Sequence, residues 1–548
     1  MKHFKWLKLG KKSSPERCCE PPVWLGNRSN GEYYLPQTPR DRLVRKLILE
    51  RADENARRLG LERREFLATA MGMATSLWAL NVASCSSEKS SAAPSRSAKD
   101  AGRDTGYCLP EEAQLDEAAA CSVLSGSEFI FDGHTHHFDP NGEWRSASQA
   151  YQDGYQGFFD QMAGGNFPDR SVRPCSGPTS SECFTRDVYL REFFTESDTT
   201  MTVLTMWPTT PCAPSTEPNC GLLISHAELV KTRDTINRLA HSTRNITHVG
   251  IAPPFGLEIM NAMMEEACTA GVSGWKSYTG FGPGITAEGQ HGTGYKLTDD
   301  IGRAFVEKGL AVGVPIFCLH KGLLTPGLDP ATNDADDIGP AALAYPAAKF
   351  VVFHSCLFGG TPTDGGARPP EGPYDPANQN PLGVDILVRS LEQAGIGPNE
   401  NVYADLGTTW SIISNDRVQA AHVLGKLLKY VGENNLFWGS DALPAEHAQS
   451  QIEKFRAFQI GEDLQAAHGY PALTAELKAK IFGLNLAALY GIDPEAKRCA
   501  VTKDDLSTAR LILDGELGPR RFTQKMPFGP RTRREFLAFL RANRGMPG

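Results

Sequence analysis

Short apolar runs alternate with longer amphipathic stretches through the middle of this 548-residue chain. The short runs are typical of buried strands, and the stretches between them have the periodicity of helices. Strands separated by helices pair in parallel, and eight repeats of this unit predict an α/β fold, a closed (β/α)8 TIM barrel. The predicted strands cover residues 129–136, 200–207, 246–252, 273–278, 311–320, 349–354, 401–405 and 435–441.

Two of the predicted connections between strands are long insertions. The first follows the first strand and contains predicted helices at 147–162 and 185–194, separated by a loop rich in Gly, Pro and Cys. The second is a loop at 359–383 that is dense in Gly, Pro and Asp. Loops that follow barrel strands lie over the active-site mouth and set specificity, so we expect both insertions at that end of the barrel.

Polar side chains end four of the predicted strands. His134 and His136 close the first strand, and residues two apart on a strand point the same way. His320 and His354 close the fifth and sixth strands, and Asp441 closes the eighth. A parallel barrel gathers these ends, and imidazole and carboxylate are the usual ligands of a divalent metal. The pattern predicts a shared metal site, against the alternative of unrelated histidines at strand ends.

The N-terminal region has the features of a targeting segment. Residues 1–64 contain 16 Lys and Arg against 8 Asp and Glu. The hexapeptide Glu62–Leu67 then precedes an uncharged run at 68–82, which is too short for a convincing membrane span. This segment resembles a twin-arginine export signal, which a translocase reads on proteins that are already folded. The resemblance implies an exported protein, either periplasmic or anchored on the outer side of the membrane.

The end of this segment resembles a lipoprotein processing site, because small residues precede Cys85. Three outcomes stay open: a lipid anchor on Cys85, simple cleavage, or an uncleaved anchor. Upstream, the basic amphipathic stretch at 40–59 is expected either to contact a membrane surface or to be solvated. The chain is therefore divided into a basic extension (1–61), a signal (62–85), a linker and preamble (86–126), the barrel (127–495) and a C-terminal tail (496–548).

The composition is that of a globular protein with an acidic body. Hydrophobic residues make up 41% of the chain and charged residues 22%, and beyond residue 64 there are 40 Lys and Arg against 56 Asp and Glu. This balance argues against nucleic acid as a partner. Local disulfides are expected for the pairs Cys108/Cys121, Cys175/Cys183 and Cys212/Cys220. Buried thiols are expected at Cys268, Cys318 and Cys356.

Taken together, these residues resemble the amidohydrolase superfamily, in particular its branch of aminocarboxymuconate-semialdehyde decarboxylase and related metal-dependent decarboxylases and hydrolases. The resemblance implies a barrel with one divalent metal, usually zinc. It implies that His134, His136 and His320 are metal ligands, and that Asp441 is a ligand or the base for the metal-bound water. It further implies that His354 orients or polarises the substrate. The matching segments are Asp132–His136, Phe194–Asp198, Val203–Leu204, Gly294–Leu297, His320, His354, Gly439–Asp441 and Asn485.

The chemistry that these residues permit leaves three functions open. A metal with one open position activates water, and Asp441 can take a proton from it and return the proton to a leaving group. This predicts a hydrolase acting on an ester, lactone or amide bond of a small organic substrate. The same site can instead stabilise the carbanion left by departing carbon dioxide, as in a decarboxylase of a carboxylated aromatic or unsaturated acid. A non-catalytic exported binding protein is the third alternative.

Lys276, on the fourth predicted strand, is a further candidate site residue. In binuclear relatives a lysine on that strand is carboxylated and bridges two metals. The favoured alternative is a lysine that contacts an anionic substrate or pairs with a carboxylate. The sequence leaves open whether the chain forms a homo-oligomer.

Overall fold

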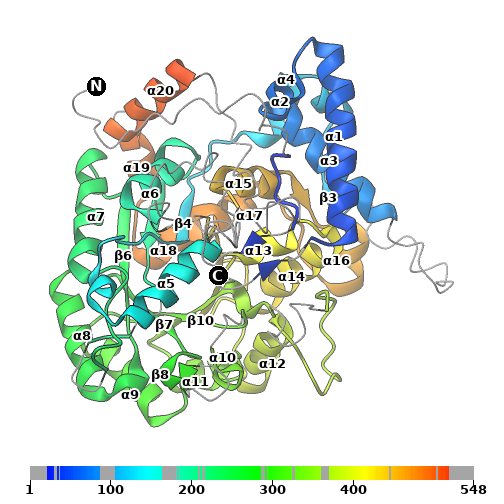
Figure 1. The fold of residues 1–548 in the computed structure, drawn as a ribbon. Coiled ribbons are helices and arrows are strands. Elements are labelled where there is room, and N and C mark those ends of the chain that lie inside the picture. Colours follow the sequence, from blue (N-terminus) through cyan, green and yellow to red (C-terminus); the bar gives the residue numbers. More distant parts are fainter. Residues whose placement is uncertain are drawn as a thin grey trace.

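The computed structural model describes a ring of strands enclosed by helices, with a group of N-terminal helices beside it (Figure 1). The described residues are 21–26, 28–29, 34–35, 37–86, 105–162, 181, 184–207, 210–212, 216–285, 291–292, 294–323, 328–358, 369–442, 446–501 and 504–517. Three sequence predictions lie outside them: the Cys175/Cys183 disulfide, the first part of the 359–383 loop and the end of the C-terminal tail.

Eight parallel strands form one sheet that runs around the barrel, and each pairs with its neighbours in chain order. The first and last strands meet through single hydrogen bonds. Gly133 N donates to Trp438 O at 2.9 Å, and Asp441 N donates to His134 O at 2.9 Å. The predicted barrel is therefore confirmed. Its strands are β4 (Phe131–Thr135), β5 (Met201–Leu204), β6 (Asn245–Gly250), β7 (Gly274–Tyr278), β10 (Ile316–His320), β11 (Lys349–Phe353), β12 (Val402–Asp405) and β13 (Leu436–Phe437).

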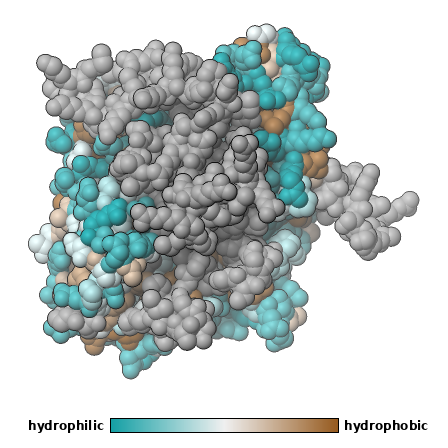
Figure 2. All heavy atoms as spheres, in the orientation of Figure 1, coloured by the Kyte–Doolittle hydropathy of each residue, from teal (hydrophilic) through white to brown (hydrophobic). Residues whose placement is uncertain are grey.

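Amphipathic helices cover the outside of the barrel. In α12 (Val384–Ala394), Val384, Leu387, Val388 and Leu391 are buried, which is the spacing of one helical face. The other outer helices are α7 (His226–Leu239), α8 (Leu257–Thr269), α9 (Asp300–Ala311), α11 (Ile338–Ala344), α14 (Arg417–Tyr430), α15 (Ala448–Ala457), α17 (Ala475–Ala479) and α18 (Asn485–Tyr490). On the face shown in Figure 2, the described surface is mostly hydrophilic, with hydrophobic residues in small scattered patches.

Shorter elements connect the barrel units. The first insertion contains α5 (Gln149–Met162) and α6 (Arg186–Leu190), and α6 continues as a π-helical turn, η7 (Arg191–Thr195). A second π-helical turn, η11 (Lys480–Leu484), interrupts the closing helix between α17 and α18. The remaining elements are β1 (Arg28–Ser29), β2 (Tyr34–Leu35), β3 (Gly106–Tyr107), η3 (Glu111–Gln114), η4 (Glu143–Ser146), η8 (Pro253–Phe255), β8 (Gly282–Ile285), β9 (His291–Gly292), α10 (Pro330–Asn333), η9 (His354–Cys356), α13 (Thr409–Ile413), β14 (Phe458–Gln459) and α16 (Glu462–His468).

The cysteine predictions are partly confirmed. Cys212 and Cys220 form a disulfide. The predicted Cys108/Cys121 disulfide is wrong, because the two residues are held on different elements. Cys108 extends the pairing of β3 with β14, where its N–H donates to Ala457 O, while Cys121 lies on α4 (Glu117–Leu124). The predicted thiols at Cys268, Cys318 and Cys356 are not disulfide-bonded, and the last two are buried.

Three N-terminal helices pack against one side of the barrel, at the upper right of Figure 1. They are α1 (Pro39–Leu59), α2 (Arg63–Leu67) and α3 (Ala70–Ser86). The apolar face of α1, formed by Val44, Ile48, Ala52 and Ala56, is buried, and α1 contacts α3. This corrects the expectation that residues 40–59 contact a membrane or are solvated, because α3 covers their apolar side. Among the described residues, no helix has the length and apolar character needed to cross a membrane.

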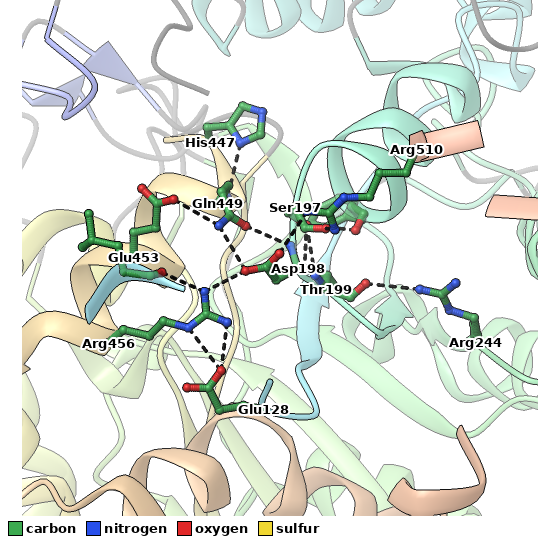
Figure 3. A network of polar contacts seen from close by, with 12 residues as sticks. Glu128, Ser197, Asp198, Thr199, Arg244, His447, Gln449, Glu453, Arg456 and Arg510 are labelled. Atoms are coloured by element: carbon green, nitrogen blue, oxygen red, sulfur yellow. Dashed lines mark hydrogen bonds and ion pairs between the residues drawn. The ribbon is translucent and has the colours of Figure 1, made fainter. Parts of the chain in front are cut away.

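The C-terminal segment packs on the barrel as α19 (Pro494–Val501) and α20 (Asp505–Leu517). Figure 3 shows Asp198, just before β5, at the centre of this contact. Its carboxylate pairs with Arg456 of α15 at 2.7 Å and with Arg510 of α20 at 3.0 Å. Next to it, Arg244 forms a buried ion pair with Asp504 at 2.6 Å. The barrel is thus the partner of this part of the tail.

Candidate metal centre

Three of the predicted site residues converge at the C-terminal end of the barrel. His134 lies one residue before the end of β4, His136 directly follows the strand, and Asp441 lies four residues beyond β13. Their ligand atoms lie within 4.8 Å of one another, and all three side chains are buried. We call these residues the ligand trio. The first and last strands of the barrel thus supply a site whose members are more than 300 residues apart in sequence.

Hydrogen bonds fix which nitrogen of each trio histidine faces the site. Nδ1 of His134 donates to Oδ2 of Asp405 at 2.7 Å, and Nδ1 of His136 donates to the carbonyl of Thr205 at 2.9 Å. The proton therefore sits on Nδ1, and Nε2 of each ring presents a lone pair. Both Nε2 atoms and Oδ1 of Asp441 are buried without a hydrogen-bond partner. Such orientation of the ligand imidazoles by outer carboxylates and carbonyls is typical of metal sites.

The protonation states of the trio also suit a cation. Burial lowers the pKa of His134 and of His136 well below the ordinary histidine value, so both rings are neutral at pH 7. Burial raises the pKa of Asp441 to about 7 and that of Asp405 to about 6. Two neutral imidazoles and one carboxylate form a donor set that a divalent cation accepts once the carboxyl proton has left.

The backbone around the trio is strained and tightly packed. Thr408 and Asp441 have φ values of 54° and 51°, in the left-handed region. Such strain gathers at functional sites, and here the Thr408 hydroxyl donates to Oδ2 of Asp441 at 2.5 Å. Gly407 is required by close approach, because a Cβ there would lie 2.2 Å from Nδ1 of His134. This geometry leaves Oδ1 of Asp441 as the oxygen that faces the trio histidines.

His320 and His354 form a second pair of imidazoles beside the trio. Nε2 of His320 donates to the Leu323 carbonyl at 2.7 Å, and Nδ1 of His354 donates to the Gly407 carbonyl at 2.8 Å. Nδ1 of His320 and Nε2 of His354 then face each other at 3.1 Å. Burial lowers the pKa of His320 well below its usual value and that of His354 to about 4. These two nitrogens are within hydrogen-bonding distance, and the tautomers of the rings decide which of them donates.

The His320 and His354 pair lies next to the trio, because the rings of His134 and His354 are 4.8 Å apart. Among the described residues, the group at this position whose ligand atoms all lie within 4.8 Å of one another consists of the trio and does not include His320. The role of His320 as a further ligand and that of His354 toward a substrate therefore stay predictions. The position of both rings beside the trio is consistent with those roles.

Two buried carboxylates that the sequence analysis did not single out support the site. Asp405 accepts from Nδ1 of His134 and, through Oδ1, from the backbone N–H of His354 at 2.6 Å. Asp132 accepts from the N–H groups of His134 at 3.2 Å and Ser440 at 3.0 Å. Asp405 closes its strand as Asp441 does, so the strand-end rule could have identified it. Asp132 was noted only as part of the family motif.

Lys276 is buried on β7 and lines a pocket next to the trio. Its Nζ lies 3.8 Å from the centre of the Phe353 ring and 4.6 Å from that of Tyr278. The pocket walls include Trp207, Tyr278 and Phe281. Trp207 packs on His136, with ring centres 5.1 Å apart, and Tyr278 stacks on His320 at 4.6 Å. The pocket therefore combines aromatic walls and an ammonium group beside the predicted ligands.

A second buried group, Glu192, Glu196 and His447, also has ligand atoms within 4.8 Å of one another. Its charges have partners within the protein. Arg191 pairs with Glu196 at 2.5 Å, and Ala448 N donates to Glu192 at 2.9 Å. Burial alone would raise the pKa of Glu196, but the hydrogen bond from His447 and the charge of Arg191 outweigh it and lower this pKa to about 2. We interpret the group as an ion-pair cluster.

Comparison with known proteins identifies a family for most of the barrel. Residues 226–492 match the family model described as amidohydrolase. The match includes His320, His354 and Asp441 and begins after His134 and His136. No protein with a curated function matches the chain.

Several solved structures resemble the barrel region in shape. An uncharacterised TIM-barrel protein from Bordetella bronchiseptica has a TM-score of 0.41 and 12% identity, covering 68% of this chain and 99% of its own. The 2,6-dihydroxybenzoate decarboxylase from Rhizobium has a TM-score of 0.34 and 14% identity, covering 67% and 99%. The 5-carboxyvanillate decarboxylase from Sphingomonas paucimobilis has a TM-score of 0.34 and 12% identity, covering 67% and 100%. These identities are too low to transfer an activity.

Proposed function

Since the barrel of this chain belongs to the amidohydrolase superfamily, we propose that it is a zinc-dependent hydrolase of an ester, lactone or amide bond in a small organic substrate. The superfamily consists of enzymes that use a divalent metal, and the ligand trio is intact in this chain. This sets aside the alternative of a non-catalytic binding protein. Zinc is proposed because it accepts imidazole and carboxylate donors together.

The observation that carries the proposal is the set of three buried polar atoms without hydrogen-bond partners. Burying a polar atom without a partner costs free energy, so such atoms are rare unless they bind something. Here two imidazole nitrogens and one carboxylate oxygen converge, and Asp405 and Thr205 fix both rings in the tautomer that a metal needs. His134, His136 and Asp441 would hold the cation, with His320 as the further predicted ligand.

A divalent cation supplies a Lewis acid that polarises a substrate oxygen and lowers the pKa of water at an open position. The protein groups then manage the protons. Asp441 is placed to take a proton from the attacking water and to return it to the leaving group, because the Thr408 hydroxyl fixes its second oxygen. His354, which the Gly407 carbonyl holds through Nδ1, would orient the substrate. The aromatic walls of the Lys276 pocket exclude water from the rest of the substrate.

Metal analysis of the purified protein tests the proposal. We expect about one zinc per chain in the wild type and loss of it in His134→Ala, because that change removes one of three donors. His241→Asn is the matched control, since His241 is 67% exposed and far from the trio in sequence. Full metal occupancy in His134→Ala would show that the cation binds at another place in the protein. Acid release from a panel of esters, lactones and amides then tests hydrolysis directly.

Decarboxylation of a carboxylated aromatic or unsaturated acid is the second candidate, and the Lys276 pocket favours it. An ammonium group between aromatic rings fits a planar substrate that carries an anionic group. The two reactions are separated by their products. If carbon dioxide is released from carboxylated aromatic acids and no acid is released from lactones or esters, the reaction is decarboxylation and the proposal of hydrolysis is wrong.

The variant Lys276→Met tests the role of this lysine in either reaction. If Lys276 binds an anionic group, we expect KM to rise roughly 10- to 100-fold, the loss of one charge-assisted contact, with metal content unchanged. A fall in metal content would instead indicate that Lys276 is carboxylated and acts as a ligand. Unchanged KM and unchanged metal content would remove Lys276 from the site.

A further inference from the structure

The apolar run that resembles the core of an export signal is largely buried. It forms α3, in which Ala70, Ala74, Leu77, Ala79 and Ala83 have no exposed surface. The polar residues Thr75 and Ser76 of the same helix are also fully buried. A helix that is apolar all round is stable in water only inside a protein core. The helix thus behaves as a core element of the folded chain.

The neighbours of α3 lie both before and after it in the sequence. It contacts α1 on the N-terminal side, and α4, η3, β3 and α14 from the body of the protein. The side chain of Asn81 makes two hydrogen bonds with the backbone of Tyr107, donating at 2.8 Å and accepting at 3.0 Å. The hydroxyl of Tyr107 in turn donates to the carbonyl of Ser414, beside the barrel helix α14. Two further hydrogen bonds connect the N-terminal helices to the segment that contains η3 and α4. Asn55 donates to the Gln114 carbonyl, and the N–H of Ala70 donates to the Glu117 carboxylate.

The twin-arginine hexapeptide is itself part of this packing. Phe66 and Leu67 have no exposed surface, and Arg63 pairs with Asp53 of α1 at 2.9 Å. The turn from α2 to α3 is close, because a Cβ on Gly72 would lie 2.5 Å from the carbonyl of Phe66. A translocase that reads the arginines with the adjacent apolar residues would therefore find those residues covered in the folded protein.

Residues upstream of α1 contact segments that follow the site residues in sequence. Ser450 donates to the carbonyl of Pro22 at 2.8 Å, and Asn415 donates to the carbonyl of Trp24 at 2.9 Å. Val23 and Leu25 are buried. Ser450 follows the loop that carries Asp441, and Asn415 follows the segment that carries Thr408. A cut near Cys85 would break the covalent connection of this arm, and of the helices, to the barrel.

We propose that residues 21–86 stay in the mature enzyme as an integral layer of its core, and that the twin-arginine segment is a helix junction in the folded state. Removing this layer would expose the apolar faces of α4 and α14 that α3 covers. The three outcomes left open by the sequence differ at this point. Lipidation of Cys85 and simple cleavage both cut the chain between α3 and the body of the protein, whereas an uncleaved segment keeps the two connected. Export through a twin-arginine translocase would require α2 and α3 to be undocked.

Cleavage of the folded chain tests this proposal. A recognition sequence for a specific protease is inserted between residues 87 and 104, which lie outside the described residues, and the full-length protein is cut after purification. We expect the two fragments to elute together in gel filtration and to separate only in denaturant. Release of the N-terminal fragment, with unchanged unfolding temperature and zinc affinity of the remaining barrel, would overturn the proposal.

A pair of variants in the uncut chain gives an independent measurement. Leu77→Asp places a charge at a fully buried position of α3, and Leu59→Asp places one at a 37% exposed position at the end of α1. We expect the unfolding temperature of the whole protein to fall by several degrees in Leu77→Asp and to change little in the control. Equal unfolding temperatures in the two variants would show that α3 is not part of the core. The intact mass of the protein recovered from cells shows which residues are retained.

Discussion

At the scale of single residues, the site depends on which nitrogen of each imidazole carries a proton. Asp405 and the Thr205 carbonyl hold the protons of His134 and His136 on Nδ1, so that both Nε2 atoms are available as donors to a cation. Asp405 also accepts from the backbone of His354, and it therefore links the trio with the second histidine pair. One carboxylate thus orients residues on two strands.

The variant Asp405→Asn tests this orientation. Asparagine has the same size but only one acceptor oxygen, so either His134 or the His354 N–H faces an amide donor. We expect zinc affinity to fall roughly 10- to 100-fold, the usual effect of losing such an outer partner. Asp375→Asn, in an exposed loop, is the control. Competition with a zinc chelator measures the affinities, and equal values for wild type and Asp405→Asn would refute the role of Asp405.

The pH dependence of metal binding follows from Asp441. In the metal-free protein burial raises its pKa to about 7, so below pH 7 the carboxyl is protonated and must lose the proton to bind a cation. Zinc affinity should therefore fall as pH decreases, by about tenfold per pH unit below pH 7. His134 and His136 stay neutral over this range because their pKa values lie well below 6.5.

Chelator competition between pH 5.5 and 8 measures this slope. In Asp441→Asn the group that exchanges the proton is gone, so the affinity should be weaker at every pH and should depend less on pH. The same slope in the variant would assign the proton to another buried carboxyl, either Asp132 or Asp405, since burial raises their pKa values to about 7 and about 6.

Single residues also show where prediction from sequence succeeds. His134, His136 and Asp441 were predicted to meet because strand ends meet in a parallel barrel, and the structure places them together. Asp405 also closes a strand and could have been identified by the same rule, but its bond to His134, 271 residues away in sequence, has no local mark in the sequence. The direction of the His320 ring was equally hidden, since the Leu323 carbonyl sets it.

At the scale of elements, the type of each segment was predicted better than its ends. The predicted strand 311–320 begins five residues later as β10, because residues up to 311 complete α9. The predicted helix at 185–194 is divided into α6 and the π-helical turn η7. An apolar residue can end a helix or begin a strand, so periodicity alone does not place the boundary.

The docking of α20 on the barrel depends on a buried ion pair. The side chains of Arg244 and Asp504 are 3% and 1% exposed, and their charged atoms lie 2.6 Å apart. Arg244→Gln leaves the Asp504 carboxylate buried without its partner, which costs about 3–5 kcal/mol of unfolding free energy. Arg510→Gln is the matched control, because Arg510 is 39% exposed and its pair with Asp198 contributes about 1 kcal/mol or less.

Urea unfolding of both variants measures the difference. We expect the midpoint to fall clearly in Arg244→Gln and little in Arg510→Gln, with zinc content unchanged in both. A similar loss in the two variants would mean that α20 is held by its whole surface, so that the single buried pair does not dominate the docking. Loss of zinc in Arg244→Gln would indicate that the C-terminal segment also shapes the site.

At the scale of the whole molecule, the barrel could be predicted but the N-terminal layer could not. The barrel follows from a repeated local pattern, which each strand and helix confirms independently. The apolar run at 68–82 is compatible with a signal or with a buried helix, because both are apolar all round. Only the positions of α1, α4 and α14 around α3 decide between the two, and those contacts join distant parts of the sequence.

Removal of the metal should affect the stability of the entire barrel. The trio joins β4 to the segment after β13, at the seam where the sheet lacks a continuous ladder and only single hydrogen bonds connect the strands. A cation bound there links the first strand to the last.

Binding stabilises the folded state by about 2.7 kcal/mol when the free metal is 100 times its Kd. For a protein of this size that corresponds to roughly 2–4 °C in the unfolding temperature. Thermal unfolding with zinc and with a chelator measures the shift, and His136→Ala should show almost none because it lacks a ligand. An equal shift in the variant would place the stabilising cation outside the trio, and the barrel seam would then depend on hydrogen bonds alone.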